Sequence, residues 1–171
     1  MFCWSDIVIL IEFACIFRTD EKDLRYMREK AAFRGTTRYA SIGALEMKDQ
    51  CRKDDVEAWW YMVLEWMIGQ LPWKHCRGAD RAEVKMYKQQ LRLEQNLRKV
   101  LKHTPEEYMA NIILYIDTLE YNSIPDYDHI AAHLEAAMQA YHLSYSEPLD
   151  WDLMTEYKGP RYVKNLDYEL R

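Results

Sequence analysis

Few residues of this chain have the types and spacing that known reactions require. His129 and His133 are four residues apart on an expected helix, a spacing that can hold a metal ion, but no glutamate or third ligand accompanies them in sequence. The four cysteines show no Cys-x-x-Cys spacing, and no Gly-x-Ser-x-Gly motif is present. The sequence therefore indicates neither a metal centre nor a nucleophile of a recognised local type.

Composition and charge describe an ordinary globular domain. The chain has 171 residues, of which 49% are apolar and 30% charged, and it is long enough for one domain with a sizeable core. Nine Lys and Arg against three Asp and Glu occupy residues 74–103. This segment is either a site for an acidic partner or phosphate, or the solvated face of a helix. No long run of one sign suggests a nucleic-acid tail, so we expect no nucleic-acid partner.

A helix over residues 54–69 is the element around which the rest must pack. Its apolar residues recur at helical spacing, and further apolar residues cover most of the opposite face. A helix that is apolar nearly all round is typically buried in the middle of a domain. Asp54 and Glu57 are predicted to form its N-cap and the reciprocal partner. Gly69 and Pro72 are predicted to end it.

Other segments predict further helices and one strand. Residues 6–17 read as a buried strand, because the segment is too short to span a bilayer and lacks the positive charge of a leader. We expect a short helix within 41–50, an amphipathic helix over 80–101 with its Lys and Arg outward, a helix capped by Thr104, and a helix over about 125–142. The fold class is therefore mainly α: a bundle around one buried helix, with a short β remnant at the N-terminus.

Several spaced motifs carry a family resemblance. The strings FRGTTRYAS, DD-x-E-x-W-x-Y and GQLPW, within residues 33–73, resemble the large-lobe signature of casein kinase 1 protein kinases. Later strings, LKHTPEEY, LEYNSIPDY and SEPLDWD, are most similar to the tau-tubulin kinase branch. The resemblance implies a partial kinase domain over 1–152, comprising the activation segment and the large (C-terminal) lobe, followed by an irregular tail over 153–171.

The resemblance also implies an activity, transfer of the ATP γ-phosphate to Ser or Thr of protein substrates with Mg²⁺ as the metal. Such a kinase needs a Gly-rich loop, a strand lysine and a His-Arg-Asp motif, and the sequence contains none of them. We therefore expect no catalytic residue in this chain, no activity of the chain alone, and no ATP or Mg²⁺ bound by it alone. The alternative is a non-catalytic interaction or scaffold module derived from a kinase.

By the same resemblance, Glu12 matches the metal-binding carboxylate of the kinase Asp-Phe-Gly motif, which is Glu12-Phe13-Ala14 here. Glutamate is one methylene longer than aspartate, and Mg²⁺ demands near-ideal octahedral geometry. Ala14 replaces a glycine and limits the flexibility of that loop. The alternative is a glutamate at the end of a strand, with no metal.

Other positions match the substrate side of the family's site. Gly35, Thr36 and Arg38 match the substrate-side loop, in which the arginine contributes to a pocket for phosphorylated or acidic substrates. The alternative for Arg38 is an ordinary surface or loop-pairing arginine, and Lys74 and His75 stand where the family has a small residue.

Three further residues are assigned structural roles. Asp55 matches the aspartate that holds the catalytic loop; its alternative role is to cap the helix. Trp59 is expected in the core, and Trp73 is assigned a structural role.

Partners and location follow from these assignments. We expect a protein substrate or protein partner, no membrane association, and self-association through the lobe interface that the missing half would leave exposed. Cysteines without a secretory leader indicate reduced thiols and a cytoplasmic protein, with the nucleus as the alternative.

Overall fold

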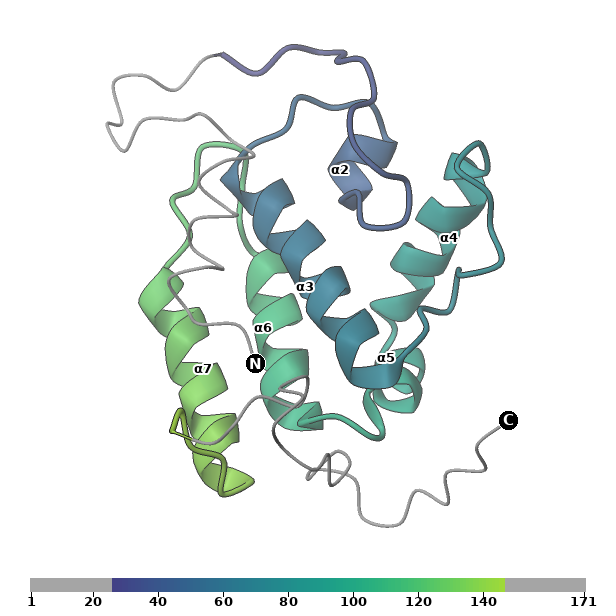
Figure 1. Cartoon of the computed structure of the whole chain (residues 1–171). Coiled ribbons are helices and arrows are strands. Elements are labelled where there is room, and N and C mark those ends of the chain that lie inside the picture. The colour runs from purple at the N-terminus through teal and green to yellow at the C-terminus, as the bar shows by residue number, and fades with distance from the viewer. Residues whose placement is uncertain (1–25, 147–171) are drawn as a thin grey trace.

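A computed structural model describes residues 26–146, and over that range it contains six helices and no strand (Figure 1). The expected mainly helical architecture is confirmed. The helices are α2 (Ile42–Leu45), α3 (Arg52–Ile68), α4 (Arg81–Leu91), α5 (Glu94–Leu101), α6 (Glu106–Asp117) and α7 (Tyr127–Ala140). The strand predicted within residues 6–17 and the tail over 153–171 lie outside the described residues. None of the helices described is long and apolar enough to cross a membrane.

The helix α3 runs through the middle of the bundle, as its apolar sequence predicts. In Figure 1 it lies between α6 on one side and α2 with α4 on the other, and α7 covers the far side of α6. Trp60, Tyr61 and Leu64 of α3 have no exposed surface. The indole Nε1 of Trp60 donates a hydrogen bond to the carbonyl of Met109 at 3.0 Å, which joins α3 to α6 inside the core.

The start of α3 differs from the prediction. The helix begins two residues earlier than expected, and its N-cap is Cys51 rather than Asp54. The Asp54 carboxylate accepts hydrogen bonds from the backbone N–H of Cys51 at 2.8 Å and from its thiol at 3.3 Å. Asp54 is therefore the acidic third residue of the capping box, and the prediction that it is the N-cap with Glu57 as its partner is wrong.

The single helix predicted over residues 80–101 is also wrong, because the chain breaks between α4 and α5. Leu93 has an extended backbone (ψ 130°), and the carbonyl of Gln90 accepts from the N–H of Leu93 at 3.1 Å and from Nδ2 of Asn96 at 2.9 Å. The break lets α5, which carries the buried Leu97, pack on α6 while α4 packs on α2. Nor do all the basic side chains of this segment point outward, since Lys88 has no exposed surface.

The last two helices begin near the predicted residues. The Thr104 hydroxyl does not cap α6; it donates to the carbonyl of Leu101 at 2.9 Å and so closes the end of α5. At α7, the Asp126 carboxylate accepts from the N–H of His129 at 2.9 Å, as a side-chain N-cap does. These contacts fix the turns that lead into α6 and α7.

The end of α3 depends on a glycine, as the sequence predicts. Gly69 has φ +78°, and its N–H donates to the carbonyl of Glu65 at 2.7 Å. A Cβ added at Gly69 would meet no atom within 4 Å. The requirement for glycine therefore comes from the backbone conformation alone.

We predict that Gly69→Ala lowers the free energy of unfolding by about 1–2 kcal/mol, because an L-residue is strained at this positive φ. Urea unfolding measures the change. Gly78→Ala is the matched control, since a Cβ there also meets no atom within 4 Å and its φ is not in the left-handed region. Equal destabilisation by the two substitutions would contradict the explanation.

Candidate functional site

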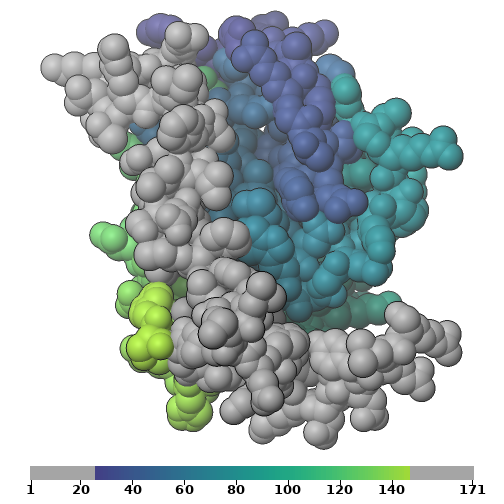
Figure 2. Space-filling model, in the orientation of Figure 1, coloured from purple at the N-terminus to yellow at the C-terminus, as the bar shows by residue number. Residues whose placement is uncertain are grey.

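The loop that precedes α2 lies on the surface of the bundle. Figure 2 shows the segment from residue 26 onward as the purple atoms at one end of the molecule. A tight turn shapes the loop, because the carbonyl of Thr36 accepts from the N–H groups of Tyr39 at 3.1 Å and Ala40 at 3.0 Å. Gly35 has φ +100°, a conformation that favours glycine. The loop therefore presents Gly35, Thr36 and Arg38 to solvent.

Bonds to its main chain hold this loop on the bundle. The indole of Trp73 donates to the carbonyl of Arg38 at 2.8 Å, and the ammonium of Lys88 donates to the carbonyl of Ala40. In the other direction, the Thr37 hydroxyl donates to the carbonyl of Gly78 at 2.7 Å. The structure thus brings two of the predicted site residues, Arg38 and Trp73, into direct contact.

The Arg38 side chain lies at the surface and is paired. Its Nη1 donates to Oε1 of Glu65 at 3.2 Å, and the guanidinium side chain is 45% exposed. The Tyr39 hydroxyl donates to the same carboxylate, and this hydrogen bond raises the pKa of Tyr39. A guanidinium has five N–H donors, so the contact with Glu65 leaves donors that can bind a phosphate or carboxylate.

Lys88 carries its ammonium into the core beneath the loop. The Nζ atom lies 4.2 Å from the ring centroid of Tyr61 and 5.0 Å from that of Trp73, within cation–π range. It also lies 3.5 Å from the carbonyl of Thr37, at the limit of a hydrogen bond. Burial lowers the pKa of Lys88 to about 7, and nearby Glu57 acts against that shift.

The Glu57 carboxylate is the second buried charge. It accepts from the Tyr61 hydroxyl at 2.7 Å, from the backbone N–H of Ile42 at 3.1 Å and from Nη2 of Arg92 at 3.1 Å. Burial raises the pKa of Glu57, and the positive charge of Arg92 acts in the opposite direction. Arg92 also contacts Asp117 at 2.8 Å. These contacts join α2, α3, α6 and the break between α4 and α5.

Sequence reasoning missed the burial of Lys88 and Arg92, because both were counted with an outward basic face. The signal was present for Lys88. It stands four residues after Val84 and three before Leu91, both of which are buried, so it occupies the apolar stripe of α4. The burial of Arg92 depends on the helix break, and no glycine or proline in the sequence marks that break.

The remaining predicted residues are spread over the chain. Asp55 is half-buried in the first turn of α3, where a carboxylate interacts favourably with the helix dipole. Trp59 and Trp73 are buried in the core. Glu12 lies outside the described residues.

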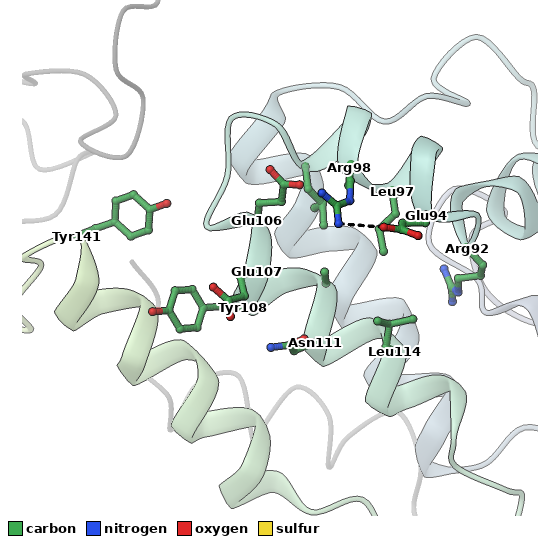
Figure 3. Close-up of a pocket in the computed structure, with 12 residues that line it drawn as sticks. Arg92, Glu94, Leu97, Arg98, Glu106, Glu107, Tyr108, Asn111, Leu114 and Tyr141 are labelled. Carbon is green, nitrogen blue, oxygen red and sulfur yellow. Dashed lines mark ion pairs between the residues drawn. The ribbon is translucent and has the colours of Figure 1, made fainter.

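A separate hollow of about 730 Å³ lies between α5 and α6 and extends to Tyr141 (Figure 3). Charges of both signs line it, including an ion pair between Arg98 and Glu94 at 2.9 Å. Its lining comes from Arg92, α5, α6 and Tyr141, and includes no residue of the loop that carries Arg38. The hollow is therefore distinct from the loop site.

Comparison with known proteins gives one consistent result, although no family model matches the chain. A probable serine/threonine-protein kinase of Dictyostelium discoideum is 30% identical over 152 residues, which is 88% of this chain and 29% of the kinase. The serine/threonine-protein kinase spe-6 of Caenorhabditis elegans is 31% identical over 72% of this chain and 33% of its own length. The chain is homologous to part of a serine/threonine kinase.

Casein kinase I homolog 1 of Schizosaccharomyces pombe is 28% identical over 83% of this chain and 32% of its own length. The predicted kinase relationship is thereby confirmed, and the relatives include casein kinase I homologs. The chain spans about a third of the length of each of these three relatives.

We predict that Glu57→Gln lowers the free energy of unfolding by about 3 kcal/mol, because removing one partner of a buried pair leaves Arg92 under-compensated. Chemical denaturation measures the effect. Glu94→Gln is the matched control, because its pair with Arg98 has side chains 77% and 70% exposed and should contribute little. A loss at Glu57 no larger than that at Glu94 would show that the buried network is not stabilising.

The pKa of Lys88 generates a pH prediction with a definite sign. An unfolded lysine has its ordinary pKa of 10.5, while that of Lys88 in the folded chain is lowered to about 7. Between these values the unfolded chain binds more protons at Lys88 than the folded chain does. The contribution of Lys88 to the free energy of unfolding therefore rises with pH across this window and is lowest below about pH 7. This contribution rises by at most about 1.4 kcal/mol per pH unit.

Lys88→Met should flatten this rise, because methionine has a similar length and does not titrate. Urea unfolding of both proteins between about pH 7 and pH 9 measures the difference in slope. Lys99→Met, at an exposed position of α5, should retain the wild-type slope. Parallel curves for wild type and Lys88→Met would show that Lys88 stays protonated in the fold.

Proposed function

We propose that this chain forms the substrate-facing part of the large lobe of a casein kinase 1-type serine/threonine kinase, of the tau-tubulin kinase-like branch. The whole protein would transfer the ATP γ-phosphate to Ser or Thr of protein substrates. The observation that carries the proposal is the exposed 35–38 loop, anchored through its backbone to the lobe, in a chain homologous to part of such kinases. We place this activity in the cytoplasm or nucleus.

In this proposal Arg38 recognises the substrate. Its guanidinium is exposed, and a fork of N–H groups can bind two oxygens of a phosphate or carboxylate. The pair with Glu65 orients the side chain and competes with the ligand for it. Substrates with a phosphorylated or acidic residue near the target hydroxyl would therefore be preferred.

We assign ATP and Mg²⁺ to parts of the whole protein outside residues 26–146. Mg²⁺ takes oxygen ligands, whereas the one three-ligand cluster found among residues 26–146 includes a sulfur and an imidazole. The described residues therefore do not fit this metal, and no step of phosphoryl transfer is derived through them. Glu12 stays a candidate carboxylate for the metal, with the strand-end role as its alternative.

A second candidate function is a non-catalytic interaction module. The sequence Glu12-Phe13-Ala14, where kinases have Asp-Phe-Gly, favours it. Such a module would keep the loop at 35–38 for binding acidic partners and would bind a partner through the lobe interface that an absent half would leave exposed. The same exposed interface predicts that the 171-residue chain self-associates. Sedimentation velocity tests this, and a clean monomer would count against the chain being a partial large lobe.

The deciding experiment maps the 5′ end of the transcript and expresses the protein encoded by the complete reading frame. It then measures γ-phosphate transfer to a peptide that has no acidic residue near the target hydroxyl, with and without a phosphoserine. We predict that Arg38→Ala lowers kcat/KM for the phosphorylated peptide about tenfold more than for the unphosphorylated one, because charge-assisted hydrogen bonds contribute roughly 1.5–3 kcal/mol.

Arg34→Ala is the matched control, because Arg34 is an exposed arginine four residues earlier in the same segment. It should affect both peptides equally. If the complete protein transfers no phosphate, the kinase proposal fails and the interaction module stands. If transfer occurs but Arg38→Ala affects both peptides equally, the role of Arg38 in recognition fails.

A further inference from the structure

Three side chains of different chemistry converge where the chain turns from Trp73 toward α4. His75 and Cys76 lie on the turn, and Glu83 lies in the first turn of α4. One ligand atom from each, an imidazole nitrogen, a thiol sulfur and a carboxylate oxygen, lies within 4.8 Å of the other two. None of these residues takes part in the loop contacts described above.

A single atom, Nε2 of His75, is the centre of these contacts. It lies 3.6 Å from Sγ of Cys76 and 3.5 Å from Oε1 of Glu83. The Tyr87 hydroxyl lies 3.3 Å from the same nitrogen. An imidazole nitrogen has one lone pair or one N–H, so it can form a good hydrogen bond with only one of these three neighbours. The imidazole nitrogen, the thiol sulfur and the carboxylate oxygen therefore lie in one place, where they could share a metal ion.

The two separations from the imidazole nitrogen agree with those of ligands around a tetrahedral zinc ion. With Zn–N near 2.0–2.1 Å, Zn–S near 2.3 Å and Zn–O near 2.0–2.2 Å, two ligand atoms at the tetrahedral angle lie about 3.6 Å apart for nitrogen and sulfur and about 3.4 Å apart for nitrogen and oxygen. The observed distances from His75 are 3.6 Å to the sulfur and 3.5 Å to the oxygen. The third pair, the sulfur and the carboxylate oxygen, lies within 4.8 Å, so adjustment of the exposed side chains can close the three atoms on an ion.

The surrounding structure holds the ligands in place. Backbone hydrogen bonds from Lys74 to Leu71 at 2.9 Å and from Cys76 to Trp73 at 3.0 Å fix the turn, and Trp73 is buried. The ring of Tyr87 packs edge-on against the imidazole, with centroids 5.4 Å apart, and orients it. Glu83 and Tyr87 are one helical turn apart on α4 and therefore share a face.

We propose that His75, Cys76 and Glu83 bind Zn²⁺, with the fourth position open to water. Thiolate and imidazole ligands select zinc over the hard cations Mg²⁺ and Ca²⁺, which prefer oxygen. The side chains of His75 and Glu83 are 59% and 46% exposed, so the ion has a path of entry and a solvent-facing position. Bound zinc would join the turn to α4, next to the buried Trp73 that holds the loop of Arg38.

The experiment titrates the chelator-treated 171-residue chain with Co²⁺ as a spectroscopic probe and then displaces it with Zn²⁺. We expect one equivalent to bind and to give thiolate-to-cobalt charge-transfer absorption, which zinc removes. Cys76→Ser should abolish this absorption. Glu83→Gln removes a direct ligand and should weaken zinc binding by at least roughly 10–100-fold, the loss seen when a residue that only hydrogen-bonds to a ligand is removed.

His133→Gln and Tyr87→Phe are the controls. The first removes a histidine of α7, and the second keeps the ring that packs on His75 but removes its hydroxyl; both should bind zinc as the wild type does. Circular dichroism checks that each variant folds. If Cys76→Ser does not fold, protection of Cys76 from alkylation by zinc in the wild-type chain, measured by peptide mass, tests the same ligand.

Three results would overturn the proposal. They are the absence of a cobalt–thiolate band, a band that persists in folded Cys76→Ser, and alkylation of Cys76 at the same rate with and without zinc. The cluster would then be a surface contact between His75 and Glu83 beside a free thiol. The outcome is independent of the proposed kinase function, because no readout uses ATP or a peptide.

Discussion

Two ionisable side chains, one acidic and one basic, are buried against the central helix and constrain the rest of the structure. Glu57 is 2% exposed and Lys88 has no exposed surface, so the polar end of each side chain needs fixed partners. For Glu57 these are a hydroxyl, a backbone N–H and the guanidinium of Arg92; for Lys88 they are backbone carbonyls and two aromatic faces. Because the partners come from α2, α3, the loop at 36–40, the turn that carries Trp73 and the break that carries Arg92, satisfying the two side chains fixes where those segments lie.

The same constraint links the core to the exposed loop. Tyr61 donates its hydroxyl to Glu57 and offers its ring to Lys88, and Lys88 in turn binds the carbonyl of Ala40. The Trp73 ring packs edge-on against Tyr61, while its N–H binds the carbonyl of Arg38. A short chain of contacts therefore runs from the middle of α3 to the residue proposed to recognise an anion.

The periodicity of apolar residues predicted most of the helices. It did not predict the helix break at Leu93 or the N-cap of α3, which depend on side-chain hydrogen bonds and ion pairs. The apolar spacing of α3 and the glycine with positive φ at its end were sufficient to predict a buried helix that stops at residue 68 or 69. The break at Leu93 was missed because neither glycine nor proline marks it; it is set by Asn96 bonding back to Gln90 and by Arg92 reaching Asp117. The capping box was placed three residues too late because cysteine is an uncommon cap.

For the candidate site, the family motifs predicted which loop to examine but not how it is held. The contact between Arg38 and Trp73 joins positions 35 residues apart, and the bonds of Lys88 to the loop span 48 and 51 residues. No local pattern encodes such pairs. The burial of Lys88 could have been inferred from its place in the stripe of α4, had its charge not suggested an outward position.

The way the loop is anchored also affects how its surface can diverge among related proteins. Its bonds to Trp73 and Lys88 use main-chain carbonyls at residues 38 and 40, which every amino acid supplies. Side chains at 34, 36 and 38 can therefore change without loss of these bonds, whereas Gly35 and Thr37 are restricted by a positive φ and by a hydroxyl bond. Selection on what this surface recognises can thus proceed largely apart from selection on the stability of the helices beneath it.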